Sequence, residues 1–483
     1  MPVENYTNVI IGSGEGGKYL AWHLGSSGQK TAVVERRWIG GSCPNINCLP
    51  SKNEVWSAKV AQLVRRGERF GVKPDPGPSN LAAVTKRKRE MVAGLVAKHL
   101  ELYKASGAEL IMGQAHFTGP KTVEVKLNDG ESRTLAGERL FLNLGTHAFI
   151  PPSPGLAESM PLTNIELLEL DRLPEHLIVV GSGYVGLEFA QAYRRFGSRV
   201  TVLEQSSQLL SNADPDVAAE MERILTAEGI ELISPAKIVG VHGRSGSGVT
   251  IELQTPSGDK QISGSDILVA AGRVPNTAGI GLESIGVELD SKGFIKVNDR
   301  LETTAPNIWA IGEGAGSAQF THVSFDDFRV IRDNLAGKNR STRGRVVPSC
   351  LFTDPQLAHI GLTEKDASRQ GIVVEVVKMP MRSVLRAITI DETSGFMKAL
   401  VDLRNGLVRG FTMIGPEAGE VVAVVQMAML CGRPYTTLRD AIITHPTMAE
   451  ALGALFSNVK QAKIEEGTEP DSRGSRDLQP SAA

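Results

Sequence analysis

Two of the four cysteines lie close together near the N-terminus, in the segment GGSCPNINCLPSK at residues 40–52. Cys43 and Cys48 could bind zinc, form a structural disulfide or carry out thiol–disulfide chemistry. A structural zinc site needs four ligands, and neither the isolated Cys350 and Cys431 nor a closely spaced histidine pair completes one. A structural disulfide across so short a loop would remove little conformational entropy from the unfolded chain. A redox-active pair is therefore the favoured interpretation.

The residues after this pair support that interpretation. Pro50 is typical of the first turn of a helix, which predicts that both cysteines lie near a helix N-terminus, where the dipole favours a thiolate. Lys52 follows Cys48 by four residues, so it shares a helix face with that thiol and its ammonium could stabilise the thiolate. Spacing alone leaves it equally open that Lys52 is an exposed surface lysine.

Two repeated segments predict how such a site is built. Residues 7–37 and 176–206 each read as strand, glycine-rich turn, helix and strand. Their G-x-G-x-x-G motifs consist of Gly12, Gly14 and Gly17, and of Gly181, Gly183 and Gly186. Each following strand ends in an acid, Glu35 or Glu204, at the spacing that suits a carboxylate bonded to an adenosine ribose. Two dinucleotide sites in one chain, each with a pyrophosphate at a helix N-terminus, predict a relay between two cofactors.

The second acid also predicts which nicotinamide is used. Glu204 would repel the 2′-phosphate of NADPH, and no arginine appears until Arg223. The sequence therefore favours NADH over NADPH.

Composition excludes some function classes. The 483 residues carry a net charge of −2, which gives no general reason to expect a nucleic acid or an anionic membrane as partner. No apolar run is long enough to span a bilayer, and the N-terminus lacks the features of a signal peptide, so a cytoplasmic location is expected. The basic run Lys86–Arg89 lies within a helical pattern and is interpreted as a solvated helix face. Cys350 and Cys431 lie in apolar surroundings and are expected in the core.

The order of the motifs resembles one family. The segment at 40–52, the two glycine-rich units, AIGE at 310–313 and HPTMAE at 445–450 are similar to the flavoprotein disulfide reductases, also called class I pyridine nucleotide-disulfide oxidoreductases. That family includes lipoamide dehydrogenase, glutathione reductase and mercuric reductase. The resemblance extends from residue 5 to about residue 460.

The resemblance implies an α/β fold with two Rossmann-type domains, one for FAD and one for NAD, and a C-terminal α+β dimerisation domain. The implied boundaries are 1–150 with 272–345 for FAD, 151–271 for NAD and 346–460 for the interface. The polar segment 461–483 is expected to be disordered. The implied assembly is a homodimer whose subunits share the active site, with no membrane or nucleic-acid partner.

The resemblance also implies residue roles. Cys48 is expected to be the thiol against the flavin, and Cys43 the thiol that attacks the substrate. Lys52 would pair with Glu188 near the flavin. His445, oriented by Glu450, would act as acid and base across the dimer interface. The residues implied in binding FAD or NAD are Gly12, Gly14, Gly17, Glu35, Gly145, Thr146, Gly312 and Glu313, together with Gly181, Gly183, Gly186, Glu204, Gly272 and Arg273.

Another interpretation of HPTMAE needs no resemblance. Thr447 and Glu450 have the spacing of a capping box at the start of a helix, and this reading is compatible with a catalytic His445.

Several residues depart from the family pattern. Pro44 and Asn47 lie inside the active loop where the family commonly has an aliphatic residue and a glycine, and Glu313 replaces an aspartate. Asn53 and Glu54 put polar groups on a helix side that is often apolar, which argues against ordinary lipoamide dehydrogenase activity.

The substrate is therefore left open as a disulfide, a thiol or a small oxidant. A mercuric-reductase-like activity is an alternative, although the C-terminal segment lacks the Cys-Cys pair that many mercuric reductases carry. A redox-sensing or assembly subunit is an alternative of another class.

Overall fold

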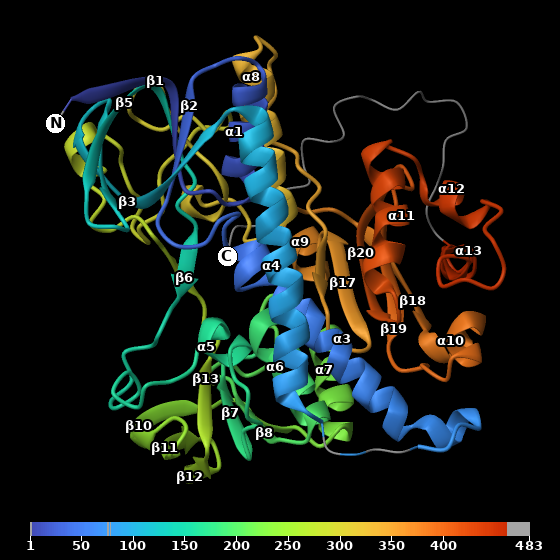
Figure 1. Cartoon of the computed structure of the whole chain (residues 1–483). Coiled ribbons are helices and arrows are strands. Elements are labelled where there is room, and N and C mark those ends of the chain that lie inside the picture. Colours follow the sequence, from blue (N-terminus) through green and yellow to red (C-terminus); the bar gives the residue numbers. More distant parts are fainter. Residues whose placement is uncertain (1, 75–76, 78, 461–483) are drawn as a thin grey trace.

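The computed structural model describes residues 2–74, 77 and 79–460, so the expected disorder of 461–483 concerns residues outside this range. The described chain forms three lobes, each built on a β-sheet (Figure 1). The long helix α4 (Leu81–Ser106) runs down the front of the molecule between them. Within the described residues, no helix is both long and apolar enough to cross a membrane.

The first sheet combines N-terminal strands with one strand from far along the chain. Its parallel strands run in the order β3-β2-β1-β5-β15, and β4 pairs antiparallel with β3 and β5. Every residue of β2 is buried, as expected for a parallel strand covered on both faces. The strands are β1 (Val3–Ile11), β2 (Thr31–Glu35), β3 (Glu109–Gly119), β4 (Thr122–Leu127), β5 (Ser132–Leu142) and β15 (Ile308–Ala310).

Helix α1 (Glu15–Ser26) packs against both α4 and α8 (Thr321–Leu335) beside this sheet. Their apolar side chains share one core cluster with residues of β1, β2 and β5. A short antiparallel pair, β6 (Thr146–Ala148) and β14 (Arg273–Pro275), lies where the chain passes to and from the second lobe. The single-turn helices labelled η are η1 (Gly67–Phe70), η2 (Glu283–Ile285), η3 (Gly312–Ala315) and η4 (Met381–Ser383), of which η4 lies in the third lobe.

The second lobe repeats the strand–helix–strand arrangement. Its parallel sheet has the order β13-β7-β8-β9, and a separate antiparallel sheet has the order β10-β11-β12. The strands are β7 (His176–Val180), β8 (Arg199–Leu203), β9 (Glu231–Ile233), β10 (Lys237–Arg244), β11 (Gly248–Thr255), β12 (Gly258–Gly264) and β13 (Asp266–Val269). The helices are α5 (Asn164–Leu168), α6 (Tyr184–Phe196) and α7 (Pro215–Ala227).

The third lobe is an antiparallel sheet with helices packed on it, and the predicted mixed α/β fold class is therefore confirmed. The strand order is β16-β17-β20-β19-β18. The strands are β16 (Ser349–Leu351), β17 (Gln356–Gly361), β18 (Val374–Pro380), β19 (Phe396–Asp402) and β20 (Val408–Gly415). The helices are α9 (Glu364–Arg369), α10 (Leu385–Thr389), α11 (Ala418–Leu430), α12 (Tyr435–Arg439) and α13 (Ala451–Phe456).

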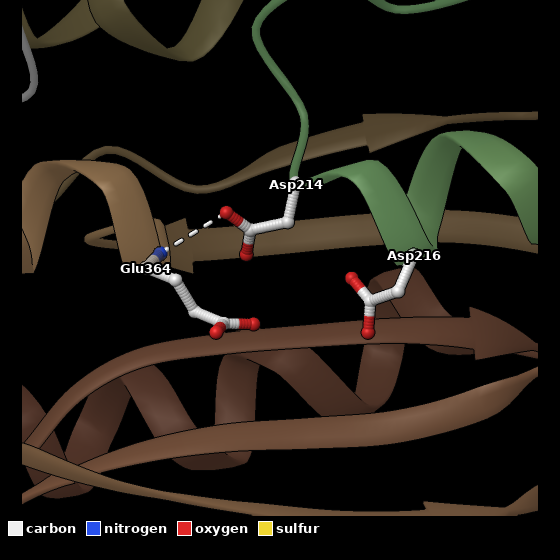
Figure 2. A group of neighbouring side chains, drawn as sticks. All are labelled: Asp214, Asp216 and Glu364. Carbon is white, nitrogen blue, oxygen red and sulfur yellow. Dashed lines mark hydrogen bonds between the residues drawn. The ribbon is translucent and has the colours of Figure 1, made fainter.

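A buried lysine joins the second and third lobes. The Nζ atom of Lys398, on β19, lies 2.8 Å from a carboxylate oxygen of Asp214, 2.7 Å from one of Asp216 and 2.9 Å from one of Glu364. Figure 2 shows the two aspartates at the start of α7 and Glu364 at the start of α9, where its backbone N–H donates to Asp214. The three acids are close enough to hold a metal ion. The Lys398 ammonium already contacts all three acids, and the Lys378 ammonium lies 2.9 Å from a carboxylate oxygen of Asp216. We therefore interpret the cluster as a set of ion pairs that joins two lobes.

Two expectations about exposure hold only in part. Within the basic run 86–89, Lys86, Arg87 and Arg89 are exposed as expected. The side chain of Lys88 is only 1 % exposed, because its ammonium bonds the Leu168 carbonyl at the end of α5 and the Glu169 carboxylate. A lysine at a helix C-terminus is favourable there, because the free carbonyl groups carry partial negative charge. Cys431 is exposed just after α11, outside the core, whereas Cys350 is partly buried and packs on the third lobe's core.

Candidate active site

The first glycine-rich turn, between β1 and α1, fits a bound dinucleotide. A Cβ at Gly12 would lie 2.2 Å from a backbone oxygen of Asn143, and one at Gly17 would lie 2.4 Å from the Gly12 carbonyl oxygen. Glu35, at the end of β2, accepts hydrogen bonds from the Ser13 N–H at 2.9 Å and the Ser13 hydroxyl at 2.7 Å. A helix N-terminus packed closely on its strand, with a carboxylate beside it, is an arrangement that suits a dinucleotide.

The second turn has the same construction. A Cβ at Gly186 would lie 2.1 Å from the Gly181 carbonyl oxygen, whereas one at Gly183 would meet nothing within 4 Å. Glu204 accepts from the Ser182 N–H at 3.1 Å and from its hydroxyl at 2.6 Å. The open space at Gly183, next to the N-terminus of α6, fits a second pyrophosphate.

Hydrogen bonds also keep the Glu204 carboxyl group charged. Burial raises its pKa, but the bonds from Ser182 and Ser206 outweigh burial, and the pKa is lowered overall. An ionised carboxylate accepts bonds from a ribose hydroxyl and repels a phosphate at the same position.

The loop that carries Cys43 touches the first turn. Gly41 has φ +78°, and a Cβ there would lie 2.4 Å from the Cα atom of Gly14. The short helix α2 (Ser42–Asn45) follows, and the amide of Asn45 donates to the Gly41 carbonyl oxygen at 2.7 Å. The loop is thus fixed next to the candidate FAD site.

Cys48 is the first residue of helix α3 (Cys48–Arg65), and Pro50 lies in its first turn as predicted. The Cys48 Sγ atom lies 3.1 Å from the hydroxyl oxygen of Thr321 at the start of α8. The hydrogen bond from Cys43 lowers the pKa of Cys48, and Thr321 and Lys52 act in the same direction against burial. The bond with Cys48 and burial both raise the pKa of Cys43. The two thiols are therefore unequal, and their surroundings favour a thiolate on Cys48 over one on Cys43.

Lys52 is paired and is not a free surface lysine. Its Nζ atom lies 2.7 Å from a carboxylate oxygen of Glu188 on α6, and the Glu188 side chain is 4 % exposed. The other Glu188 oxygen accepts the Phe352 N–H at 2.9 Å, and the Lys52 ammonium lies 4.9 Å from the centre of that phenyl ring. All three lobes therefore contribute to the position of Lys52.

Thr146, Arg273 and Glu313 form one hydrogen-bonded group beside the β6–β14 pair. The Arg273 Nε atom donates to the Thr146 hydroxyl oxygen at 2.6 Å, and that hydroxyl donates to Glu313. The longer acid at 313 is thus held by this chain's own side chains. The neighbouring glycines with positive φ are Gly145, Gly272 and Gly312.

His445 and Glu450 are brought together in the third lobe. The His445 Nδ1 atom lies 2.9 Å from a Glu450 carboxylate oxygen, and the imidazole is 66 % exposed. Within the described part of this chain, no hydrogen bond joins His445 to either thiol. The backbone N–H of Glu450 donates to the Thr447 hydroxyl, so half of the predicted capping box is formed while the Glu450 side chain bonds His445.

Sequence reasoning missed three residues of this region. Thr321 contacts Cys48, Asn143 packs under the first glycine turn, and the buried Asp327 accepts the Gly312 N–H at 2.7 Å. Thr321 and Asn143 lie far along the chain from the groups they contact, whereas Asp327 lies 15 residues after Gly312. Asp327 could have been noticed as an acid within an apolar helical pattern, but Thr321 and Asn143 gave no signal.

Two family models match the chain. The pyridine nucleotide-disulphide oxidoreductase model matches residues 6–327, and the dimerisation-domain model of the same name matches residues 347–455.

Three of the curated relatives match over nearly their whole length. The probable pyridine nucleotide-disulfide oxidoreductase RclA of Escherichia coli is 35 % identical over 95 % of this chain and 100 % of its own. A dihydrolipoyl dehydrogenase of Thermus scotoductus is 33 % identical over 93 % and 96 % of the two chains. A mercuric reductase of Streptomyces lividans is 33 % identical over 92 % and 94 %. Among solved structures, a Cu(II) complex of the HOCl-induced flavoprotein disulfide reductase RclA from E. coli has a TM-score of 0.86 at 34 % identity, covering 95 % of this chain and 100 % of its own.

Proposed function

This chain belongs to the pyridine nucleotide-disulphide oxidoreductase family, whose members are FAD-dependent enzymes, and we propose that its electrons pass from NADH through Cys48 and Cys43 to a small acceptor. The observation that carries the proposal is the unequal setting of the two thiols. Cys48 lies beside the Thr321 hydroxyl and the Lys52–Glu188 pair, which favour a thiolate. Cys43 is held as a thiol, ready to lose its proton to a base when it attacks.

Bound FAD supplies the chemistry that accepts a hydride from the nicotinamide and returns two electrons to the disulfide. With two electrons and one proton, the Cys43–Cys48 disulfide opens to a Cys48 thiolate and a Cys43 thiol. After deprotonation, Cys43 attacks one sulfur of a disulfide acceptor and releases the other as a thiol. Cys48 then attacks Cys43, which re-forms the internal disulfide and releases the second thiol.

The base for Cys43 is proposed to come from a second subunit. His445 is exposed and oriented by Glu450, and an imidazole is suited to moving protons near neutral pH. The match to a dimerisation domain supports a homodimer. We assign the role of orienting His445 to Glu450 of the same subunit.

A second candidate acceptor is a metal ion or a small oxidant reduced by the same dithiol. This candidate is favoured by the relatives, which include mercuric reductases and RclA, an HOCl-induced reductase solved as a Cu(II) complex. The two candidates differ in what leaves the enzyme, because a disulfide yields two thiols whereas Cu(II) yields Cu(I) one electron at a time.

Anaerobic titration with NADH tests the relay. We expect a long-wavelength absorbance band after two electrons, caused by the Cys48 thiolate beside the flavin, and loss of that band in Cys48→Ser. A two-electron form without the band would contradict the relay.

Steady-state NADH oxidation with lipoamide, small disulfides, Hg²⁺, Cu²⁺ and hypochlorous acid then ranks the acceptors. Cys43→Ser should abolish turnover with disulfides, whereas the matched control Cys431→Ser, which changes an exposed thiol, should leave it intact. If no acceptor supports turnover and a protein partner binds only the reduced form, the dithiol acts as a redox sensor instead.

A further inference from the structure

A residue outside every motif holds the loop that carries Cys43. His99 lies on α4, and its ring edge contacts the loop at Gly40. A Cβ added at Gly40 would lie 2.3 Å from His99 Nδ1, 2.7 Å from His99 Cε1 and 3.1 Å from Pro44 Cγ. The imidazole and the proline ring therefore both lie against Gly40. Pro44 is buried and directly follows Cys43.

His99 is itself held in place by an aromatic cluster of α1 and α4. The His99 ring centre lies 5.6 Å from that of Trp22, and Trp22 lies 5.6 Å from Tyr103 and 5.1 Å from Tyr19. Burial, with a smaller contribution from Lys18, lowers the pKa of His99 to about 4. The ring is neutral at neutral pH, so its effect on the loop is one of shape.

We propose that His99 is a positioning residue that presses the segment Gly40–Pro44 into place and thereby keeps Cys43 within reach of Cys48. The proposal rests on the proposed function, because it concerns how readily this pair closes. Disulfide geometry is specific, so the closing equilibrium depends on how often the two sulfur atoms occupy bonding positions. A loop held against α4 spends more of its time in that arrangement, which favours the disulfide.

The closing equilibrium of the holoenzyme can be measured without turnover. The protein is equilibrated anaerobically with mixtures of glutathione and glutathione disulfide, and its free thiols are trapped with a maleimide and counted by mass. In this exchange the Cys43–Cys48 disulfide is reduced by two glutathione thiols, which gives the protein dithiol and one glutathione disulfide. We expect His99→Ala to lower the equilibrium constant for closing about tenfold, which for a two-electron couple is a rise of about 30 mV in potential.

Two matched variants separate loop support from other effects. His99→Phe keeps a ring against Gly40 and should stay within about twofold of the parent protein, because packing does not need the ring nitrogen. Lys98→Ala changes an exposed neighbour on the same turn and should change nothing. An unchanged equilibrium in His99→Ala, or an equal loss in His99→Phe, would overturn the proposal.

Pro44→Ala tests the same contact from the loop if His99→Ala fails to retain FAD. It should lower the closing constant at least about threefold, and an unchanged value would overturn the proposal. Where both single variants fold, the double variant should lower the closing constant by less than the product of the two single effects, because both side chains pack against Gly40. If the parent protein forms no Cys43–Cys48 disulfide at any glutathione ratio, the proposed function fails, which is a separate result.

Discussion

The charge on Cys48 depends on a hydroxyl from a distant helix. Thr321 lies 3.1 Å from the Cys48 sulfur and lowers its pKa together with Cys43 and Lys52. Because the folded pKa is below the ordinary thiol value, the thiolate is present at neutral pH and is lost as the pH falls through the lowered pKa. This sets the acid limit of the thiolate form.

We expect Thr321→Val to raise the pKa of Cys48 by about one unit, because a hydrogen bond to a charged group contributes about 1.5 kcal/mol. The long-wavelength band of the two-electron-reduced protein should then appear at higher pH. A pH titration of that band measures the shift. Thr321→Ser keeps the hydroxyl and should titrate like the parent, and a valine variant that does the same would show that Thr321 has no such role.

Glu204 is expected to decide between the two nicotinamide cofactors. Its carboxylate is ionised and held by Ser182, where it would accept a ribose hydroxyl and repel a 2′-phosphate. Glu204→Ala should lower the ratio of kcat/KM for NADH to kcat/KM for NADPH at least about tenfold, mainly through changes in KM. Glu222→Ala, an exposed change on α7, is the control. An unchanged ratio would contradict this assignment.

The ion-pair cluster around Lys398 holds elements of the second and third lobes together. It places the N-termini of α7 and α9 against β19 through one ammonium and three carboxylates. Burial raises the pKa of Asp216, but bonds from Lys398 and Lys378 outweigh burial and lower it overall. The stabilisation is therefore present above the ordinary carboxyl pKa and is lost as the pH falls through the lowered one.

We expect Lys398→Met to reduce the free energy of unfolding by about 3 kcal/mol near neutral pH, because it leaves the buried Asp214 without its counter-charge. Denaturant unfolding followed by circular dichroism measures the loss. Lys378→Met is the matched control, since Lys378 is 43 % exposed and contacts only Asp216 of the cluster. The difference between Lys398→Met and the parent should shrink in acid, where the carboxylates protonate. If Lys398→Met and Lys378→Met have equal free energies of unfolding, the buried cluster contributes little to stability.

The assembly matters because the thiols and His445 have no hydrogen bond between them within the described part of one chain. If each site takes its histidine from the other subunit, mixing two inactive variants restores activity. Cys43→Ser and His445→Gln subunits are unfolded and reassembled together in equal amounts. They should regain about a quarter of the parent turnover, because about half of the dimers are mixed and each mixed dimer has one intact site of two. Each variant reassembled alone is the control. No recovery in verified mixed dimers would place the histidine's function within one subunit.

We expect helix α11 to contribute to the dimer interface. Met427 and Leu430 are 53 % and 56 % exposed, and both lie within the match to the dimerisation domain. Met427→Glu with Leu430→Glu should weaken the dimer, because a charge at an apolar interface loses its water without gaining a partner. Light scattering after size-exclusion chromatography measures the mass. Val239→Glu on β10 is the control, and a double variant that remains fully dimeric would exclude this surface.

Local patterns in the sequence predicted much of the site. The two glycine turns, the terminal acids Glu35 and Glu204 and the helix that begins at Cys48 all follow from short-range spacing, because neighbours in a turn or helix meet at fixed intervals. The Lys52–Glu188 pair could be named only through the family resemblance, since 136 residues separate the two side chains. The domain boundaries and the assigned site residues stay predictions.

The amino-acid sequence by itself determined the two glycine-rich turns, the nearby cysteine pair and the family, because each depends on residues close together in the chain or on their order. Only the tertiary structure decided that Thr321 lies against Cys48, that His99 presses on the Cys43 loop, and that Lys88 and Lys398 are buried ions. These contacts join helices and strands far apart in sequence. Their geometry depends on how the lobes pack, and no local spacing encodes it.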